Sequence, residues 1–260
     1  MNRYFYLIKL QYLGYRYHGW QKQPKVKTVQ FMVDRTLKYI LPDTAIKTLA
    51  AGRTDAKVSA EQAAFELFLD RPLNDLSIFM EEFNFNLPQD IRALSIEEVD
   101  ENFNIIQDSK IKEYHYLFAY GQKFHPFCAP LMATILDNLD IEIMKEGASF
   151  FRGAHNFKAY CYKASEEGQY ERELVKCELV ENDVYTANFF PERTYLLKVA
   201  GSGFGRNQVR LMAGTLFDLG RGIISLEKFK SSLRPDYNGS MQYIAPASGL
   251  ILHKVEFSLD

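Results

Sequence analysis

The chain has 260 residues, of which 47% are hydrophobic and 25% are charged, and its formal net charge is −2. This length suffices for one large domain or two similar halves, and the composition is ordinary for a soluble enzyme. No apolar run approaches the roughly 18 residues of a membrane span, and residues 1–10 lack the apolar stretch of a signal peptide. We therefore expect a cytoplasmic protein.

The low net charge conceals a gradient along the chain. Residues 1–60 contain 11 Lys and Arg but 3 Asp and Glu, whereas residues 61–110 contain 3 and 12. Phosphate affinity depends on local cations and not on the average charge, so the first 60 residues predict a basic surface that faces a polyanion. A solvated basic face without a partner is the plain alternative.

The first half of the chain predicts a mixed unit of strands and helices. Aromatic and aliphatic residues alternate with polar ones over residues 3–12, which indicates a strand. Thr28 can cap a helix whose apolar stripe begins at Val29 and which stops at Pro42. Further strands are expected near 46–51, 62–69, 91–99 and 111–119, and a second helix near 74–84.

Two prolines make residues 124–130 the best candidate for a connection between halves. We accordingly place an N-terminal half at 1–123 and a C-terminal half at 131–260. The second half predicts helices near 136–150, 206–219 and 225–233, and strands near 172–180, 184–189, 194–200 and 249–257. This order favours a pseudo-duplicated α+β protein with mostly antiparallel strands.

Cysteine and histidine usage favours neither a disulfide framework nor a metal site. The three cysteines, Cys128, Cys161 and Cys177, are an odd number and do not form a CxxC pair, so we expect buried free thiols. The five histidines are scattered without an HxxxH pair, so we predict no bound metal.

The tetrapeptide Gly52-Arg53-Thr54-Asp55 is a candidate site of chemistry. It places a guanidinium, a hydroxyl and a carboxylate on a corner that glycine lets bend, and such loops display functional groups. An Asp in this setting is more often a turn former or a helix cap, so the tetrapeptide alone does not indicate catalysis.

The glycine-rich segment 201–205 leads into a helix that carries Arg206 and Arg210. These arginines are four residues apart, so they are expected to share a face near the positive end of the helix dipole. That placement is unfavourable by itself and predicts an anionic partner, either a carboxylate or an RNA phosphate. A dinucleotide-binding turn is a poorer interpretation, because GxGxxG requires glycine at position 206.

Residues 112–118 predict a strand with Tyr114, Tyr116 and Phe118 on one face. Such an aromatic stripe is most often part of a core. An exposed tyrosine at the start of the strand could instead stack on a base, as aromatic residues do in proteins that bind unpaired nucleotides.

In this order, the three motifs resemble the tRNA pseudouridine synthase A family. The likeness runs from about residue 4 to the C-terminus. It also includes segments 17–23, 86–91, 153–157, 207–210 and 245–250.

The resemblance implies two ferredoxin-like or RRM-like α/β halves that form a continuous, mostly antiparallel sheet with a central basic cleft, the pseudouridine synthase fold. It also implies a homodimer that shares one tRNA between its subunits. The implied reaction is the isomerisation of uridine to pseudouridine in the anticodon stem-loop, among tRNA positions 38–40, without a metal or an organic cofactor.

The resemblance assigns a role to each motif. Asp55 matches the family's catalytic aspartate, a nucleophile or base at the ribose, and Arg53 matches the arginine that supports the flipped nucleotide. Tyr114 matches the tyrosine that stacks on uracil and helps to remove the C5 proton, and Leu250 packs on the other side of the base. Arg210 matches the basic residue that pairs with the aspartate and keeps it ionised. The expected RNA-binding residues are Lys22, Lys25, Lys27, Lys57 and Arg206.

Two departures from the family pattern leave other functions open. Family members commonly carry glycine and histidine where this chain has Lys57 and Ser59, and an arginine where it has Ile106. One alternative is a catalytically impaired RNA-binding protein or tRNA chaperone. Another is a nucleotide-cofactor enzyme built on the turn at residues 201–205, which would bind NAD or ATP.

Overall fold

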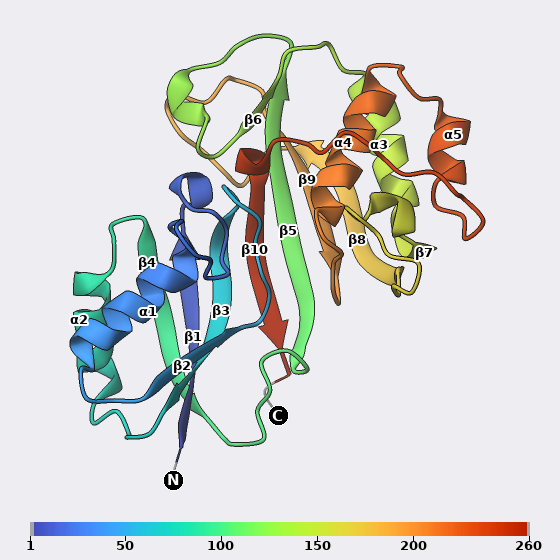
Figure 1. The fold of residues 1–260 in the computed structure, drawn as a ribbon. Helices are drawn as coiled ribbons and strands as arrows, with labels where there is room; N and C mark the ends of the chain where they lie inside the picture. Colours follow the sequence, from blue (N-terminus) through green and yellow to red (C-terminus); the bar gives the residue numbers. More distant parts are fainter. Residues whose placement is uncertain (1–2, 259–260) are drawn as a thin grey trace. The chain divides into compact units, whose positions relative to one another are not determined.

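The structure is a computed structural model that describes residues 3–258, and the chain divides into two compact units. The first unit comprises the residues up to Lys110 together with those from Leu252 onward, and the second comprises residues 111–251 (Figure 1). The boundary therefore differs from the predicted connection at 124–130, which lies inside the second unit. One continuous strand spans residues 109–120, so strand pairing and not the two prolines determines where the second unit begins.

The first unit has the element order of a ferredoxin-like fold, β-α-β-β-α-β. Its strands lie in the order β4-β1-β3-β10, and β2 also pairs with β3. β1 runs antiparallel to β3 and β4, and β2 runs antiparallel to β3. The strands are β1 (Tyr4–Tyr12), β2 (Ile46–Ala50), β3 (Ser59–Leu69), β4 (Ile91–Val99) and β10 (Leu250–Phe257), and the helices are α1 (Val29–Ile40) and α2 (Leu76–Asn86).

Local signals determine where the two helices of this unit begin. The Thr28 hydroxyl accepts a hydrogen bond of 3.2 Å from the Phe31 N–H, which confirms the predicted cap of α1. Asp75 caps α2 in the same way, because its carboxylate accepts hydrogen bonds from the Ser77 and Ile78 N–H groups at 2.8 and 3.0 Å. The predicted strands and helices of this unit are all present.

The second unit repeats the first five elements of this order, β-α-β-β-α, as β5-α3-β8-β9-α4. The short strands β6 and β7 are additions to that order. Its antiparallel strands lie in the order β5-β9-β8-β7, and β6 pairs in parallel with β5. The α+β class expected from the sequence is thus confirmed in both units. The strands are β5 (Ser109–Tyr120), β6 (Ala133–Ile135), β7 (Gly153–Asn156), β8 (Glu171–Glu181) and β9 (Tyr195–Gly201), and the helices are α3 (Ile141–Phe150), α4 (Gln208–Gly220) and α5 (Leu226–Ser231).

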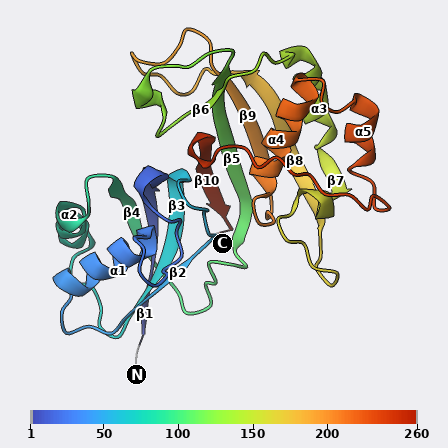
Figure 2. The same cartoon turned by 45° about the horizontal axis from the view of Figure 1, so that its top comes forward.

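The core of the second unit lies between its sheet and its helices. Figures 1 and 2 show α3, α4 and α5 gathered on one side of β8 and β9. Phe217 of α4 meets the aromatic stripe of β5, with ring centroids 6.0 Å from Tyr116 and 4.9 Å from Phe118. These contacts confirm that the stripe is mainly core.

The strand predicted at 184–189 is wrong. The Asn182 side-chain oxygen accepts hydrogen bonds from the Val184 and Tyr185 N–H groups, at 3.1 and 2.9 Å. Phe189 and Phe190 pack against a buried cluster that contains Leu117. The segment is a loop because a side chain takes its backbone hydrogen bonds and its apolar residues fill a core.

The helix predicted at 136–150 begins only at Ile141. Asp140 ends the preceding segment, because its carboxylate accepts hydrogen bonds from the Glu142 and Ile143 N–H groups and so caps α3. The short strands β6 and β7 were not predicted, since three and four residues are too few for a clear periodic pattern.

The free thiols agree largely with expectation. Cys128 and Cys177 are buried, whereas Cys161 is half-buried. Burial raises the pKa of the Cys177 thiol well above its ordinary value, so it is unreactive at neutral pH. Among residues 3–258, none of the helices combines the length and apolar character needed to cross a membrane.

Candidate active site

The corner that carries Asp55 has no regular secondary structure and is held by residues 14–20. The buried Thr54 hydroxyl shares a hydrogen bond of 2.9 Å with the Tyr12 hydroxyl, and the Thr54 carbonyl accepts one of 3.1 Å from the Trp20 N–H. On the other side of Asp55, the Lys57 N–H donates to the Tyr17 carbonyl at 3.0 Å. The backbone on both sides of the carboxylate is therefore fixed.

Two glycines make this close approach possible. A Cβ atom on Gly19 would lie 2.5 Å from the Thr54 carbonyl oxygen, and Gly19 also has a left-handed φ of +82°. A Cβ atom on Gly14 would lie 1.9 Å from the Val58 carbonyl oxygen. Gly14 also donates its N–H to the buried Ser59 hydroxyl at 2.9 Å, so Ser59 has a structural role here.

Asp90 anchors the segment that holds the corner. Its carboxylate accepts hydrogen bonds from the Arg16 guanidinium at 2.8 Å and from the Tyr17 hydroxyl at 2.7 Å, while its carbonyl accepts from the Leu13 N–H at 2.9 Å. Burial, and next the bond to Asp90, raise the pKa of Tyr17 to about 12. Tyr17 is therefore a protonated donor at neutral pH.

The corner presents both charges that the sequence predicted. Asp55 is half-exposed and Arg53 is exposed on the same loop. Lys57 is also exposed and adopts a left-handed backbone, with φ of 68° and its ammonium 5.6 Å from the centre of the Tyr15 ring. A carboxylate and two cations thus lie within five residues of a rigid loop.

The predicted basic segment adjoins this loop in the first unit. The His18 N–H donates to the Lys27 carbonyl at 2.8 Å, which ties the segment to the residues that hold the corner. Lys22, Lys25 and Lys27 are all exposed. The Lys22 ammonium lies 3.6 Å from the Asp34 carboxylate, so part of its charge is already neutralised.

In the second unit, Tyr114 lies on β5 and is only 8% exposed. The alternative of an exposed tyrosine at the start of this strand is therefore not found, and Tyr114 follows the core interpretation. The ring meets Phe204 edge-on, with centroids 5.1 Å apart, because the loop before α4 folds over the strand. This contact places Tyr114 next to the glycine-rich segment that the sequence singled out.

Arg210 lies in the first turn of α4 and is tied to the segment that leads to Leu250. Its Nε donates to the Ala245 carbonyl at 2.8 Å, and the Ala245 N–H donates to the Arg210 carbonyl at 3.1 Å. Leu250 follows a 3₁₀ turn at Ala247–Gly249 and is 6% exposed. The fold of this unit thus connects two predicted substrate-binding residues that are 40 positions apart.

Arg206 does not share a helical face with Arg210, which corrects the sequence prediction. α4 begins at Gln208, and its N-cap Asn207 has a left-handed φ of 58°. Arg206 therefore precedes the helix, and its guanidinium lies 5.1 Å from the centre of the Tyr162 ring. The left-handed residue breaks the helical phase on which the prediction depended.

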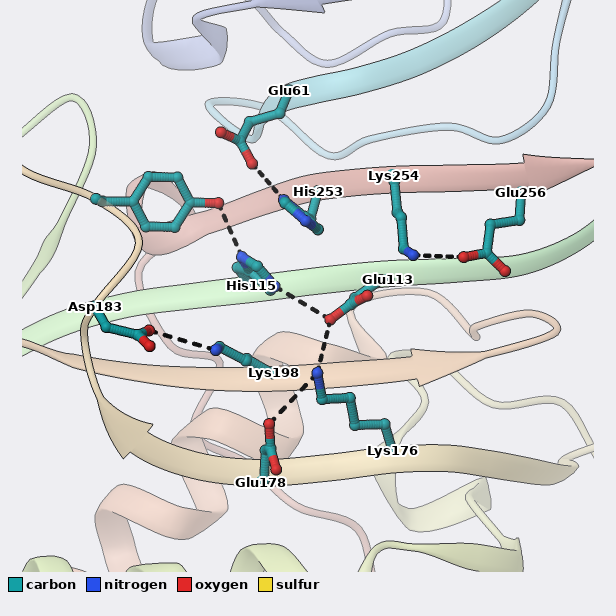
Figure 3. Close-up of polar contacts among 11 residues, drawn as sticks. Glu61, Glu113, His115, Lys176, Glu178, Asp183, Lys198, His253, Lys254 and Glu256 are labelled. Atoms are coloured by element: carbon teal, nitrogen blue, oxygen red, sulfur yellow. Dashed lines mark hydrogen bonds and ion pairs between the residues drawn. The ribbon is translucent and has the colours of Figure 1, made fainter.

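Sequence reasoning missed a buried polar network on β5 (Figure 3). His115 is 2% exposed and forms hydrogen bonds with the Tyr185 hydroxyl at 2.9 Å and the Glu113 carboxylate at 3.3 Å. Burial opposes the ionisation of Glu113, but hydrogen bonds from Lys176 and His115 outweigh it and lower the pKa of Glu113. The alternation of Glu113 and His115 with the tyrosines of β5 was the available signal.

Comparisons with known proteins agree with this arrangement. A family model described as tRNA pseudouridine synthase matches residues 148–258. The tRNA pseudouridine synthase A of Listeria welshimeri is 30% identical over 262 residues, which cover 99% of this chain and all of the relative. That of Phytoplasma mali is 30% identical over 257 residues, which cover 98% and 99%. The tRNA pseudouridine synthase A 2 of Bacillus cereus is 29% identical over 253 residues, which cover 97% and 99%.

The α+β units, the aspartate corner and the family match together define a pseudouridine synthase. The resemblance found in the sequence is confirmed, since the relatives align over nearly the whole chain. The chain belongs to the tRNA pseudouridine synthase A family.

Proposed function

We propose that this chain isomerises uridine to pseudouridine in the anticodon stem-loop of tRNA, with Asp55 as the catalytic residue. The reaction breaks the bond between N1 and C1′, turns the uracil and rejoins it through C5. A carboxylate near C1′ can act as the nucleophile or as a base at the ribose. The observation that carries the assignment is a half-exposed Asp55 on a corner whose backbone is fixed on both sides.

The proposal requires the target nucleotide to leave the stack. Flipping a nucleotide costs a few kcal/mol in lost stacking and pairing, so a cationic side chain beside the carboxylate is useful. Arg53 meets this need, because it is exposed and lies two residues before Asp55. We assign it to the phosphate or the vacated space of the flipped nucleotide.

The family resemblance assigns Tyr114, Arg210 and Leu250 to the same reaction. The second unit supports this assignment, because the start of α4 holds the segment of Leu250 and the loop before it contacts Tyr114. The resemblance also gives Arg210 the role of basic partner to the catalytic aspartate, and the proposal keeps that role.

The proposal also concerns how the enzyme meets its substrate. The exposed cations Lys25, Lys27 and Lys57 would contact tRNA phosphates, together with Lys22 and Arg206. We further propose a homodimer that acts in the cytoplasm. Each proposed step requires side chains of the protein and groups of the tRNA alone.

A tritium-release assay tests the catalytic assignment. Wild-type protein should release tritium from tRNA that carries C5-labelled uridine, and Asp55→Asn should release none while retaining its folded structure. Asp43→Asn is the matched control, because Asp43 is an exposed carboxylate in a loop of the same unit. Equal release from wild type and Asp55→Asn would refute the role of Asp55.

A second candidate is an RNA-binding protein without catalysis. The observation that favours it is Ile106, a 57% exposed apolar residue at the position where family members commonly carry an arginine. Salt-sensitive tRNA binding by wild type without tritium release would support this candidate. Release that depends on Asp55 would exclude it.

A further inference from the structure

Three residues of the second unit, Tyr162, Lys163 and Arg206, form a cluster that we call the cationic tyrosine cluster. The Arg206 guanidinium lies 5.1 Å from the centre of the Tyr162 ring, and the Lys163 ammonium lies 5.5 Å from it. Tyr162 is 37% exposed. Two cations therefore meet at one aromatic ring on the protein surface, within the usual range of a cation–π contact.

The backbone fixes this cluster. The Tyr162 N–H donates to the Arg206 carbonyl at 3.0 Å, so the loop after Tyr160 is tied to the loop before α4. Lys163 and Asn207 both adopt left-handed conformations, with φ of 54° and 58°. Such a conformation costs a lysine about 1 kcal/mol relative to its preferred regions. The fold keeps a lysine where glycine would be less strained.

Among residues 3–258, neither Lys163 nor Arg206 forms an ion pair with a carboxylate. By contrast, Lys230 lies 4.2 Å from the Phe150 ring and has the Glu146 carboxylate at 3.9 Å. Two like charges held within 5.5 Å of one ring centre repel each other, so a bound anion would stabilise the arrangement.

We propose that the cationic tyrosine cluster binds a phosphate of the tRNA backbone outside the flipped nucleotide. A guanidinium and an ammonium together match the oxygens of a phosphodiester, and the Tyr162 ring orients both cations. The inference rests on the proposed function, which supplies tRNA as the partner. It adds Tyr162 and Lys163 to the residues that bind RNA and gives Arg206 a defined ligand.

Two variants separate binding from folding. Lys163→Gly removes a charge and relieves a strained backbone, so the variant should be as stable as wild type or more stable, yet bind tRNA more weakly. Arg206→Gln removes the second charge. The slope of log affinity against log salt concentration is negative, and each variant should reduce its magnitude by about 0.7 to 0.9, the contribution of one phosphate contact. Lys230→Gln is the matched control and should leave the slope unchanged.

Binding titrations of unmodified tRNA at several salt concentrations, with tritium release measured on the same preparations, decide the matter. Unchanged slopes in both Lys163→Gly and Arg206→Gln would overturn the phosphate site, while active wild-type enzyme would leave the proposed function standing. Lowered slopes with inactive wild-type protein would support the phosphate site and refute the proposed catalysis.

Discussion

Replacing Gly19 with alanine should displace the corner that carries Asp55, the proposed catalytic residue, while leaving the Asp55 side chain itself unchanged. Two effects add at this position. The left-handed φ of +82° costs alanine about 1 kcal/mol, and the new Cβ would lie 2.5 Å from the Thr54 carbonyl oxygen. An ordinary contact needs roughly 3.4 Å, so the Thr54 backbone must move by most of an ångström.

The displacement should appear in the catalytic rate more than in tRNA binding. A misplacement of about 1 Å can lower a catalytic rate by about 100-fold, and Thr54 directly precedes Asp55. The predicted tRNA-binding cations, such as Lys25 and Lys27, have side chains outside this contact. We therefore expect Gly19→Ala to lower the single-turnover rate constant by about 100-fold and to change tRNA affinity by less than about threefold.

The assay is single-turnover tritium release with saturating enzyme, alongside thermal unfolding. Gly222→Ala is the matched control, because Gly222 has a left-handed φ of +71° but no atom within 4 Å of its added Cβ. This control should lose about 1 kcal/mol of stability and keep its rate. A wild-type rate in folded Gly19→Ala would refute the inference that this contact positions Asp55.

Three further predictions concern stability. Lys57→Gly should raise the free energy of unfolding by about 0.5 to 1 kcal/mol in urea titrations, because φ is 68° at this position; a loss of stability would contradict the strain. Thr28→Ala should lower it by about 1 kcal/mol, since α1 loses its cap, and Thr28→Ser should restore most of the loss. Glu66 is 2% exposed, and burial raises its pKa above 4.5, so its stabilising contribution is present below pH 4.5 and is lost as pH rises through the folded pKa. Glu66→Gln should therefore be more stable than wild type at pH 7 and gain less at pH 4; an equal gain at both pH values would contradict this assignment.

The sequence predicted elements that local chemistry determines. α1 starts where Thr28 can cap it, and its stripe of Val29, Val33 and Leu37 is buried as expected. The loop at 184–189 shows the limit, because its residues resemble a strand but hydrogen-bond to a side chain instead of a neighbouring strand. Hydrophobic periodicity indicates which residues are buried. It does not indicate which groups form hydrogen bonds with the backbone N–H and carbonyl groups.

The candidate site was predictable as a set of residues but not as a geometry. Asp55 and Arg53 were found through the motif, whereas the contact of Gly14 with Val58 joins residues 44 positions apart and leaves no local pattern. Arg206 was misplaced because one left-handed residue, Asn207, shifts the start of α4. The sequence therefore could not predict the contacts between distant residues or the single left-handed residue that shifts the start of a helix.

The fixed backbone of the corner that carries Asp55 determines whether the protein or the tRNA must change shape on binding. Residues 52–58 lose their conformational entropy when the protein folds and not when it binds RNA, because Thr54 and Lys57 already have hydrogen-bond partners in the free protein. The loop therefore does not wait for RNA to close over it, and amides such as that of Lys57 should exchange slowly with solvent in the free protein. The nucleic acid must therefore change shape, so tRNAs whose target uridine leaves the stack most easily should react fastest.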